Sequence, residues 1–269
     1  MTKIIFLGTG GGRFATVYQV RRTGGIYLED GARIHLDPGP GACLAMRNMR
    51  LDPSRTDAVI ISHCHPDHYG DAEIILEGMT SCSFTRRGLL AGSRSAILGT
   101  SDFGPAISRY HRSIIPEIKA MLPGDELEIK GVRLKATRTA HTDPDGIGFR
   151  FLTTKGVVCY VGDTELQNEI LDEHKGARVL IMNVTTPLHS RVRYHLCTED
   201  AAEMARVIKP ELAVITHFGS KMVHDGPEYQ RRYVEEESGV RTIAAEDFMT
   251  LHLNQRISLR RMKAVKASG

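Results

Sequence analysis

Residues 58–70 combine an apolar run with a dense cluster of side chains that can bind a metal ion. Within six residues, His63, His65, Asp67 and His68 supply three imidazoles and one carboxylate. Ligands of these two kinds suit zinc and its first-row neighbours. Packing does not account for such a cluster, so we predict a metal site in this stretch.

The element that must carry the cluster is predicted to be a buried strand. Ala58–Ile61 is apolar and rich in β-branched residues, a pattern typical of buried strands. The cluster would then lie in the loop at the end of this strand, where the sheet can hold ligands rigidly. Cys64 stands between two of the histidines, but alternation along an extended loop directs its side chain away from theirs, so we do not expect it to bind the metal.

Three further polar residues follow predicted strands in the same way. His141, Asp163 and His217 each come directly after an apolar, strand-like run. Alone, a residue in such a position is usually a cap or a satisfied polar group. Together with the cluster these residues make seven, which exceeds the needs of one metal and suits two metals that share a carboxylate. Asp37 also ends a predicted strand, where it could cap a helix or accept a hydrogen bond from a ligand histidine.

The composition is that of a soluble globular protein. The chain has 269 residues, 41% hydrophobic and 25% charged, with no apolar run of transmembrane length. The first residues predict a strand rather than a signal peptide, so we expect a cytoplasmic protein without a membrane partner. Five cysteines without CxxC spacing favour a reducing compartment. A formal net charge of +3 does not by itself indicate nucleic acid, and residues 256–269 are expected to form a solvated basic tail.

The order of predicted elements favours two sheets covered by helices rather than one doubly wound sheet. Strand signals separated by glycine turns dominate the first part of the chain, and strands and helices alternate afterwards. We expect a single domain over residues 1–269. The predicted strands are 3–7, 17–22, 25–29, 33–36, 58–61, 127–136, 148–152, 157–161, 178–182, 212–215, 240–244 and 248–253, and the predicted helices are 42–50, 71–76, part of 106–121, 165–173, 198–208, capped by Thr198, and 227–237.

The spacing of the candidate ligands resembles that of the metallo-β-lactamase superfamily. Residues 63–68 match its His-x-His-x-Asp-His signature, and Asp37 matches its early strand-end aspartate. His141, Asp163 and His217 fall in the order of the later motifs. The resemblance covers residues 3 to 253 and implies an α/β fold, the four-layer αββα metallo-β-lactamase sandwich.

The resemblance also implies how the residues share two divalent metal ions. One metal would be held by His63, His65 and His141, the second by Asp67, His68 and His217, and Asp163 would bridge them. Zinc is the default, and Mn²⁺ or Fe²⁺ occupies similar sites in some relatives. Two such ions lower the pKa of a shared water, hold hydroxide ready at neutral pH and stabilise the charge that develops on the substrate. A metal that only stabilises the fold is disfavoured, because structural zinc sites are closed four-ligand cages that are often rich in cysteine.

Within the superfamily the sequence is most similar to the RNase Z branch and its small phosphodiesterase relatives. Residues 6–10, 194–205 and 216–220 resemble motifs of that branch. By this match Asp67 and His195 are catalytic, and His195 would protonate the leaving oxygen, a role that suits an imidazole at neutral pH. In the alternative interpretation, His195 only caps or packs near the start of a helix.

Two departures from RNase Z disfavour the processing of tRNA precursors. Asp163 lies only 22 positions after His141, which leaves no room for the protruding arm with which RNase Z enzymes clamp tRNA. The segment that carries the family's HEAT-type motif is replaced here by 183–186, Asn-Val-Thr-Thr. We therefore expect a small or nucleotide-like phosphodiester substrate, with RNA still open. Arg109 and His111, in the variable segment 82–125 that often shapes the substrate mouth, are candidates for binding its phosphate.

Other activities of the same fold stay open as alternatives. A thioester or lactone hydrolase of the glyoxalase II-like or lactonase-like type could use the same centre, but such relatives need neither an equivalent of His195 nor the Gly-Thr-Gly opening. A true β-lactamase is disfavoured because Asp163 replaces the zinc-binding cysteine of the common classes. A non-hydrolytic flavodiiron-type protein would need an attached flavin domain. RNase Z-like relatives are often dimers, so the resemblance also implies a homodimer for this chain.

Overall fold

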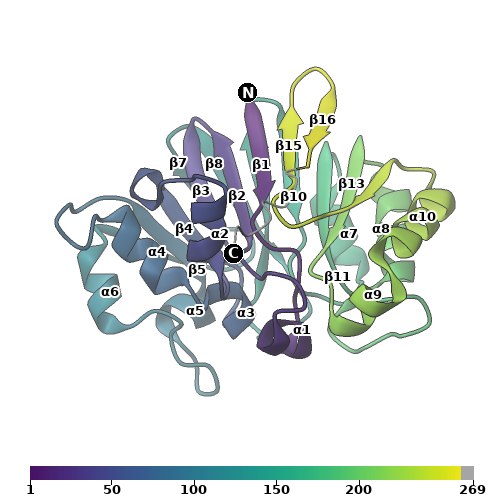
Figure 1. Cartoon of the computed structure of the whole chain (residues 1–269). Coiled ribbons are helices and arrows are strands. Elements are labelled where there is room, and N and C mark those ends of the chain that lie inside the picture. The colour runs from purple at the N-terminus through teal and green to yellow at the C-terminus, as the bar shows by residue number, and fades with distance from the viewer. Residues whose placement is uncertain (262–269) are drawn as a thin grey trace, which may run out of the picture.

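Two β-sheets packed face to face form the centre of the structure, a computed structural model that describes residues 1–261, and helices cover their outer faces (Figure 1). The four-layer αββα arrangement expected from the sequence is confirmed. No helix among the described residues is both long enough and apolar enough to cross a membrane.

The first sheet joins the beginning of the chain to its end. Its order is β16-β15-β1-β2-β3-β4-β5-β6, with parallel pairing from β3 to β6 and antiparallel pairing elsewhere. Its strands are β1 (Thr2–Phe6), β2 (Ile26–Asp30), β3 (Ala32–Leu36), β4 (Ala58–Ile61), β5 (Leu89–Ser93), β6 (Glu117–Met121), β15 (Thr250–Leu253) and β16 (Ile257–Arg260).

The second sheet is formed by the middle of the chain. Its order is β14-β13-β11-β10-β9-β8-β7, and β12 pairs with β11. Since β9 is antiparallel to both β8 and β10, the strands β8, β10, β11 and β13 all run in one direction. The strands are β7 (Glu126–Ile129), β8 (Val132–Arg138), β9 (Ile147–Thr153), β10 (Gly156–Tyr160), β11 (Val179–Thr186), β12 (Leu196–Cys197), β13 (Leu212–Thr216) and β14 (Thr242–Ala244).

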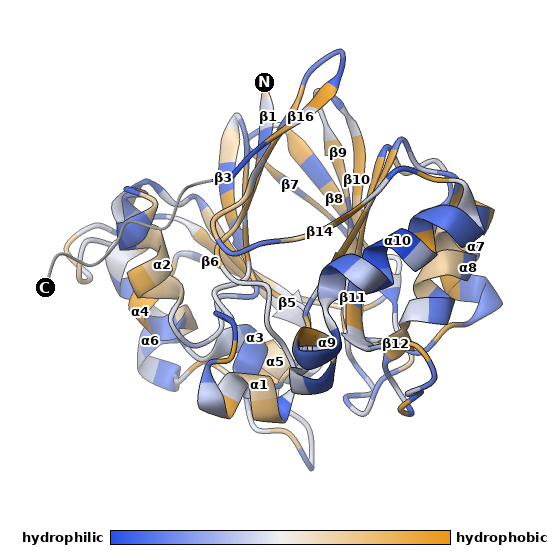
Figure 2. Ribbon diagram, turned by 45° about the vertical axis from the view of Figure 1, so that its right-hand side comes forward, coloured by the Kyte–Doolittle hydropathy of each residue, from blue (hydrophilic) through white to orange (hydrophobic). Residues whose placement is uncertain are grey.

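The helices form two outer layers and a group of short helices at one end of the sandwich (Figure 1). In Figure 2, hydrophobic colour is concentrated on the strands and hydrophilic colour on α10, which lies against α8 and β14. The first sheet is covered by α2 (Ala42–Asn48), α4 (Ala72–Met79), α5 (Arg94–Leu98) and α6 (Arg109–Ile114), the second by α7 (Asn168–His174), α8 (Thr198–Ile208) and α10 (Pro227–Ser238), and the end group is α1 (Arg13–Tyr18), α3 (Pro66–Tyr69) and α9 (Ser220–Asp225).

Strand β4 shows how one sequence pattern supplies two hydrophobic layers. Successive side chains of a strand point to opposite faces. Ile60 therefore packs in the core between the two sheets, whereas Val59 and Ile61 pack under α4 and α5. All four residues of β4 are buried, as in a parallel strand covered on both faces. The loop that follows β4 is thus attached to one of the most buried strands of the molecule.

One expectation for the local structure was wrong. Residues 17–22 were expected to form a strand, but the chain forms α1 up to Tyr18 and no strand after it, because both edges of β1 are already paired with β2 and β15. The helix expected in part of 106–121 is present as α6, which ends at Ile114, and residues 117–121 form β6. Pro116 explains why the helix ends there, since proline disfavours a helical conformation in the residue before it and cannot continue the ladder of a helix.

Two expected boundaries also differ. The N-cap of α8 is Cys197 rather than Thr198, and the Asp200 carboxylate accepts the hydrogen bond of the Cys197 N–H at 3.1 Å. Residues 256–269 were expected to be a solvated tail, but residues 257–260 form β16 on the edge of the first sheet, with Ile257 buried in the core. The basic residues Lys263 and Lys266 lie outside the described residues.

Two buried histidines should make the protein less stable in mild acid. Burial lowers the pKa of His35 to about 4 and that of His174 to about 3, and among the described residues neither ring nitrogen of His174 has a hydrogen-bond partner. In the unfolded chain both histidines take up a proton near pH 6.5, whereas in the folded chain they stay neutral at that pH. The free energy of unfolding should therefore fall by about 1.4 kcal/mol per pH unit for each residue below pH 6.5. Urea unfolding between pH 7.5 and 5 should show a weaker pH dependence for His174→Leu than for the wild type, and equal dependences would contradict this account.

Candidate metal centre

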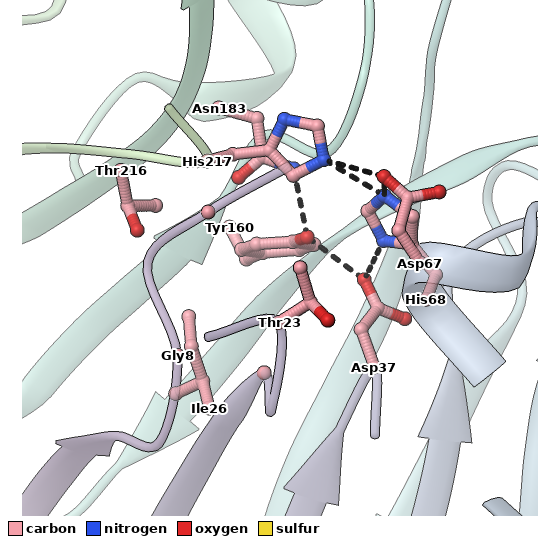
Figure 3. A pocket seen from close by; sticks show the side chains of 12 residues that line it. Gly8, Thr23, Ile26, Asp37, Asp67, His68, Tyr160, Asn183, Thr216 and His217 are labelled. Carbon is pink, nitrogen blue, oxygen red and sulfur yellow. Dashed lines mark hydrogen bonds and ion pairs between the residues drawn. The ribbon is translucent and has the colours of Figure 1, made fainter. Parts of the chain in front are cut away.

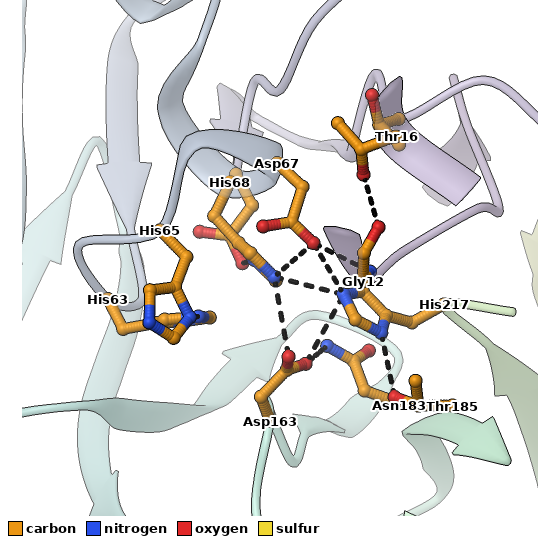
Figure 4. A network of polar contacts seen from close by, with 12 residues as sticks. Gly12, Thr16, His63, His65, Asp67, His68, Asp163, Asn183, Thr185 and His217 are labelled. Carbon is orange, nitrogen blue, oxygen red and sulfur yellow. Dashed lines mark hydrogen bonds and ion pairs between the residues drawn. The ribbon is translucent and has the colours of Figure 1, made fainter. Parts of the chain in front are cut away.

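The candidate ligands meet at one end of the sandwich because the strands that precede them end there (Figure 4). Since β8, β10 and β13 run in one direction, their carboxyl ends lie at the same edge of the second sheet. The loops after these three strands carry His141, Asp163 and His217. The loop after β4 brings residues 63–68 to the same place from the first sheet.

Three histidines form the first group of candidate ligands. His65 Nδ1 lies 3.0 Å from His63 Nε2 and 3.1 Å from His141 Nε2. Burial lowers the pKa of His63 well below its ordinary value and that of His65 to about 4. Neutral imidazole is the form that binds a metal ion. The three nitrogen atoms are therefore presented in a state that fits a cation.

A carboxylate and two histidines form the second group. His68 Nε2 lies 3.0 Å from His217 Nε2, and Asp67 Oδ2 lies 3.4 Å from the same atom of His217. Burial opposes ionisation of Asp67, but the neighbouring His68 and His217 hold the pKa of its carboxyl well below the usual range. The backbone of His217 has a φ of 61°, in the left-handed region that non-glycine residues rarely adopt. Such strain is typical of functional sites.

Asp163 lies against both groups. Its Oδ1 is 3.4 Å from His217 Nε2, its Oδ2 is 3.7 Å from His68 Nε2, and it also clusters with His63 of the first group. Burial disfavours the charge, but His217 and His68 keep the pKa of the carboxyl well below its ordinary value. The structure thus places one ionised carboxylate between two sets of three donors.

The donor chemistry of this arrangement fits divalent metal ions. The two sets are His63, His65, His141 and Asp67, His68, His217, and within each set the donor atoms lie within 4.8 Å of one another. All donors are imidazole nitrogens or carboxylate oxygens, which zinc, manganese and iron accept. The structure brings together all seven candidate metal ligands predicted from the sequence.

Asp37 supports the second group from behind. His68 Nδ1 donates to Asp37 Oδ2 at 2.9 Å, which leaves Nε2 free to face the other ligands. The Ser62 backbone N–H donates to Asp37 Oδ1 at 2.7 Å, and the Ser62 hydroxyl lies 3.0 Å from His63 Nδ1. Of the two roles considered for Asp37, the structure shows the hydrogen bond to a ligand histidine. Partners of this kind fix the tautomer and orientation of metal-binding histidines.

The glycine-rich turn before α1 also contacts the centre, which the sequence did not reveal. The Gly12 N–H donates to Asp67 Oδ2 at 2.8 Å. A Cβ at Gly11 would lie 2.2 Å from the His217 ring, so only glycine fits there. Three consecutive glycines were the one available signal of this close approach.

His195 lies at the rim of the centre. Its Nε2 is 3.8 Å from Asp163 Oδ2, and its ring is perpendicular to that of His141 with 5.0 Å between the ring centroids. The Nδ1 lies 3.1 Å from the carbonyl oxygen of Arg193, and the side chain remains 22% exposed. The geometry is therefore compatible with proton transfer to a bound substrate, and the catalytic role of His195 stays a prediction.

The two residues expected to bind phosphate do not lie near these ligands. His111 is held between Glu73 and Glu77 of α4, with both its ring nitrogens 3.2 Å from a carboxylate oxygen. Arg109 is exposed on α6, which lies beyond α4 and away from α3 (Figures 1 and 2). The structure gives no support to a role of either residue at the metal centre. Cys64, as expected, is not among the candidate ligands, and its Sγ donates to the carbonyl oxygen of Gly104 at 3.1 Å.

Comparisons with known proteins agree with this fold and site. Residues 32–218 match the family model of the beta-lactamase superfamily domain. The chain is 40% identical over 246 residues to the uncharacterized protein MJ1374 of Methanocaldococcus jannaschii, covering 90% of this chain and 92% of that one. The fold and site define a metallo-β-lactamase-type sandwich, and the chain belongs to the beta-lactamase superfamily.

Two further similarities lie within the same superfamily. The chain is 22% identical to a ribonuclease Z of Pyrobaculum aerophilum, over 82% of this chain and 88% of that one. The crystal structure of the metallo-beta-lactamase fold protein YhfI from Bacillus subtilis superposes with a TM-score of 0.77 at 18% identity, covering 93% of this chain and 98% of that one. At 18% identity, the similarity to YhfI shows the fold alone.

Metal removal should destabilise the protein, because the candidate ligands join loops from both sheets. A ligand that binds only the folded state, at a free concentration 100 times its dissociation constant, raises the free energy of unfolding by about 2.7 kcal/mol. For a chain of this size that corresponds to a melting temperature roughly 5–10 °C higher with zinc than after treatment with a chelator. A His63→Ala/His65→Ala variant should show a smaller shift. Thermal denaturation that is the same with and without metal would contradict the site.

Proposed function

We propose that the protein is a metal-dependent phosphodiesterase that hydrolyses a small or nucleotide-like phosphodiester. The observation that carries this proposal is the position of Asp163, which lies between two sets of three metal-binding side chains and 3.8 Å from His195. A shared carboxylate suits a pair of metal ions, and a neighbouring imidazole suits proton transfer to a leaving oxygen.

The residues assigned to each metal follow the two groups. His63, His65 and His141 would hold one ion, and the second group would hold the other, with Asp163 between them. Zinc is the default, and manganese or iron fits the same donors. When bound, two such ions lower the pKa of water and stabilise negative charge on phosphate oxygens.

Two residues of the chain are assigned to the remaining chemistry. Protonated His195 donates the Nε2 proton to the oxygen that leaves, while its Nδ1–H is held by the carbonyl oxygen of Arg193. This backbone acceptor orients the ring. Asp67, with Oδ2 fixed by the Gly12 N–H, would help to hold a metal ion and orient the attacking water.

The expected substrate is small, because the elements between the two motifs leave no arm. Strands β9 and β10 and their connecting turn occupy most of the segment between His141 and Asp163. The ribonuclease Z of Pyrobaculum aerophilum supports phosphodiester chemistry by name, and RNA stays open as an alternative substrate.

A comparison of substrates tests this proposal. We expect the metal-free protein, reloaded with zinc or manganese, to hydrolyse bis(p-nitrophenyl) phosphate and nucleoside 2′,3′-cyclic phosphates faster than a thioester or a lactone. A His63→Ala/His65→Ala variant controls for contaminating hydrolases. Metal-dependent cleavage of the thioester or lactone without cleavage of any phosphodiester would overturn the proposal in favour of a hydrolase of the glyoxalase II-like or lactonase-like type.

A further inference from the structure

Asn183 of β11 lies behind Asp163 and is almost fully buried, with 2% of its surface exposed. Its Nδ2 donates to Asp163 Oδ1 at 2.7 Å and to the hydroxyl of Tyr160 at 2.9 Å. An amide nitrogen carries two protons, and both are used here. Asn183 therefore holds one oxygen of the carboxylate that lies between the two ligand groups (Figure 4).

The buried Tyr160 continues this contact across the sandwich. Its hydroxyl accepts from Asn183 and donates to Asp37 Oδ2 at 2.8 Å. The same oxygen of Asp37 accepts from His68 Nδ1 at 2.9 Å. A continuous chain of hydrogen bonds thus runs from Asp163 to His68 of α3, and Figure 3 shows its part from Asn183 through Tyr160 and Asp37 to His68.

Each link in this chain has a fixed direction. The amide nitrogen of Asn183 can only donate, so the Tyr160 hydroxyl accepts from it and donates its single proton to Asp37. The hydrogen bond between His68 Nδ1 and Asp37 Oδ2 leaves His68 Nε2 facing the other candidate ligands. Buried networks in which every group is satisfied are rigid. This network fixes an oxygen of Asp163 and the orientation of His68 together.

Packing alone would not require a polar side chain at position 183. A small cavity of about 30 Å³ lies beside Asn183 and Tyr160, so apolar contacts do not fill the space behind the centre. Thr185, two residues further on the same face of β11, places its hydroxyl 3.1 Å from His217 Nδ1. Val184, between them, packs instead in the core under the helices. The face of β11 that points to the centre is the polar one.

We propose that Asn183, held by Tyr160, is a positioning residue that fixes the carboxylate of Asp163 between the two metal ions and so sets how they share it. The inference rests on the proposed dinuclear function and deepens it, because it assigns the geometry of the pair to a side chain that binds no metal. Without the Asn183 amide, the Asp163 carboxylate is free to rotate away from one ion. Loss of such supporting contacts typically weakens metal binding about 10–100-fold.

Four variants separate positioning from packing. Asn183→Ala removes both donated hydrogen bonds, and Asn183→Asp keeps the shape but replaces the donor by a second carboxylate. Tyr160→Phe removes only the hydroxyl. Val184→Ala is the matched control, because it removes buried volume from the same strand on the opposite face. Urea unfolding of the metal-free proteins reports which variants lose stability.

Zinc affinity, measured against a competing chelator, and the electron paramagnetic resonance of the manganese-loaded protein give the decisive readouts. We expect Asn183→Ala and Asn183→Asp to bind the second equivalent of metal about 10–100-fold more weakly and to lose the exchange-coupled manganese signal. Tyr160→Phe should shift in the same direction by a smaller factor, and Val184→Ala should lose stability but keep both affinities and the signal.

The failures of the two proposals are distinguishable. If the wild type binds two ions with a coupled signal, and Asn183→Ala shows the same affinities and signal, the positioning role is overturned while the dinuclear function stands. If the wild type holds a single ion, the dinuclear function is overturned and the inference with it.

Discussion

Replacement of Asp163 by alanine is expected to lower kcat for phosphodiester hydrolysis by about 1,000-fold or more. The carboxylate is buried between two sets of donors, 3.4 Å from His217 Nε2 and 3.7 Å from His68 Nε2. In the proposed dinuclear centre this carboxylate would be shared by both metal ions, so its removal would disturb both. A loss of about 4 kcal/mol in transition-state stabilisation, of the size that metal ions supply, corresponds to this factor.

Steady-state kinetics on metal-loaded protein, together with metal content per chain, measure this effect. Asp172→Ala is the matched control, because Asp172 is exposed on α7 and, among residues 1–261, forms an ion pair with Lys175 alone. The control should keep its activity and both metals. An Asp163→Ala protein that retained two metals and most of its activity would show that the carboxylate is not shared.

His195→Ala is expected to slow the reaction by an amount that depends on the leaving group. Proton donation by a side chain contributes about 100- to 10,000-fold when the leaving oxygen needs a proton. A nucleoside 2′,3′-cyclic phosphate expels a poor leaving group, a ribose alkoxide, so its hydrolysis should lose that factor. Bis(p-nitrophenyl) phosphate expels a stable phenolate, so its hydrolysis should fall much less.

The rates of both substrates with the wild type and the variant give a direct comparison. His189→Ala is the control, since His189 lies in the same loop with its side chain 91% exposed. Equal losses for the two substrates would indicate that His195 acts on binding or on the metal site. No loss for either would remove it from the mechanism.

The candidate ligands could be predicted because their positions depend on local order. Residues 63–68 follow a buried strand directly, and His141, Asp163 and His217 stand after strands that end at one edge of a sheet. Runs of apolar residues are legible in a sequence and place each ligand directly after a strand. The resemblance to the metallo-β-lactamase superfamily then implied that these strand ends meet.

The supporting residues could not be predicted, because their contacts depend on how the two sheets face each other. Nothing near Tyr160 in the sequence indicates that its hydroxyl meets Asp37, which lies 123 positions away. Asn183 stood out only as a departure from the RNase Z pattern. Its contact with Asp163 follows from the parallel register of β10 and β11. Such registers are set by packing of the whole domain.

The errors in local structure have a similar origin. The apolar side chains of α1 favoured a strand, but Phe14, Val17 and Tyr18 remain largely exposed on a helix because the first sheet offers no free edge there. The basic residues of 256–261 masked an alternating strand whose apolar positions, Ile257 and Leu259, pack on the core between the sheets. In both cases the available strand partners decided the structure.

The dependence of phosphodiester hydrolysis on the amount of metal tests the central claim most directly. Metal-free protein would be titrated with zinc while the initial rate of bis(p-nitrophenyl) phosphate hydrolysis is followed. Two sets of donors that share Asp163 predict that the rate rises to a plateau at two equivalents of zinc per chain. A plateau at one equivalent, or no hydrolysis at any zinc concentration, would contradict a dinuclear phosphodiesterase.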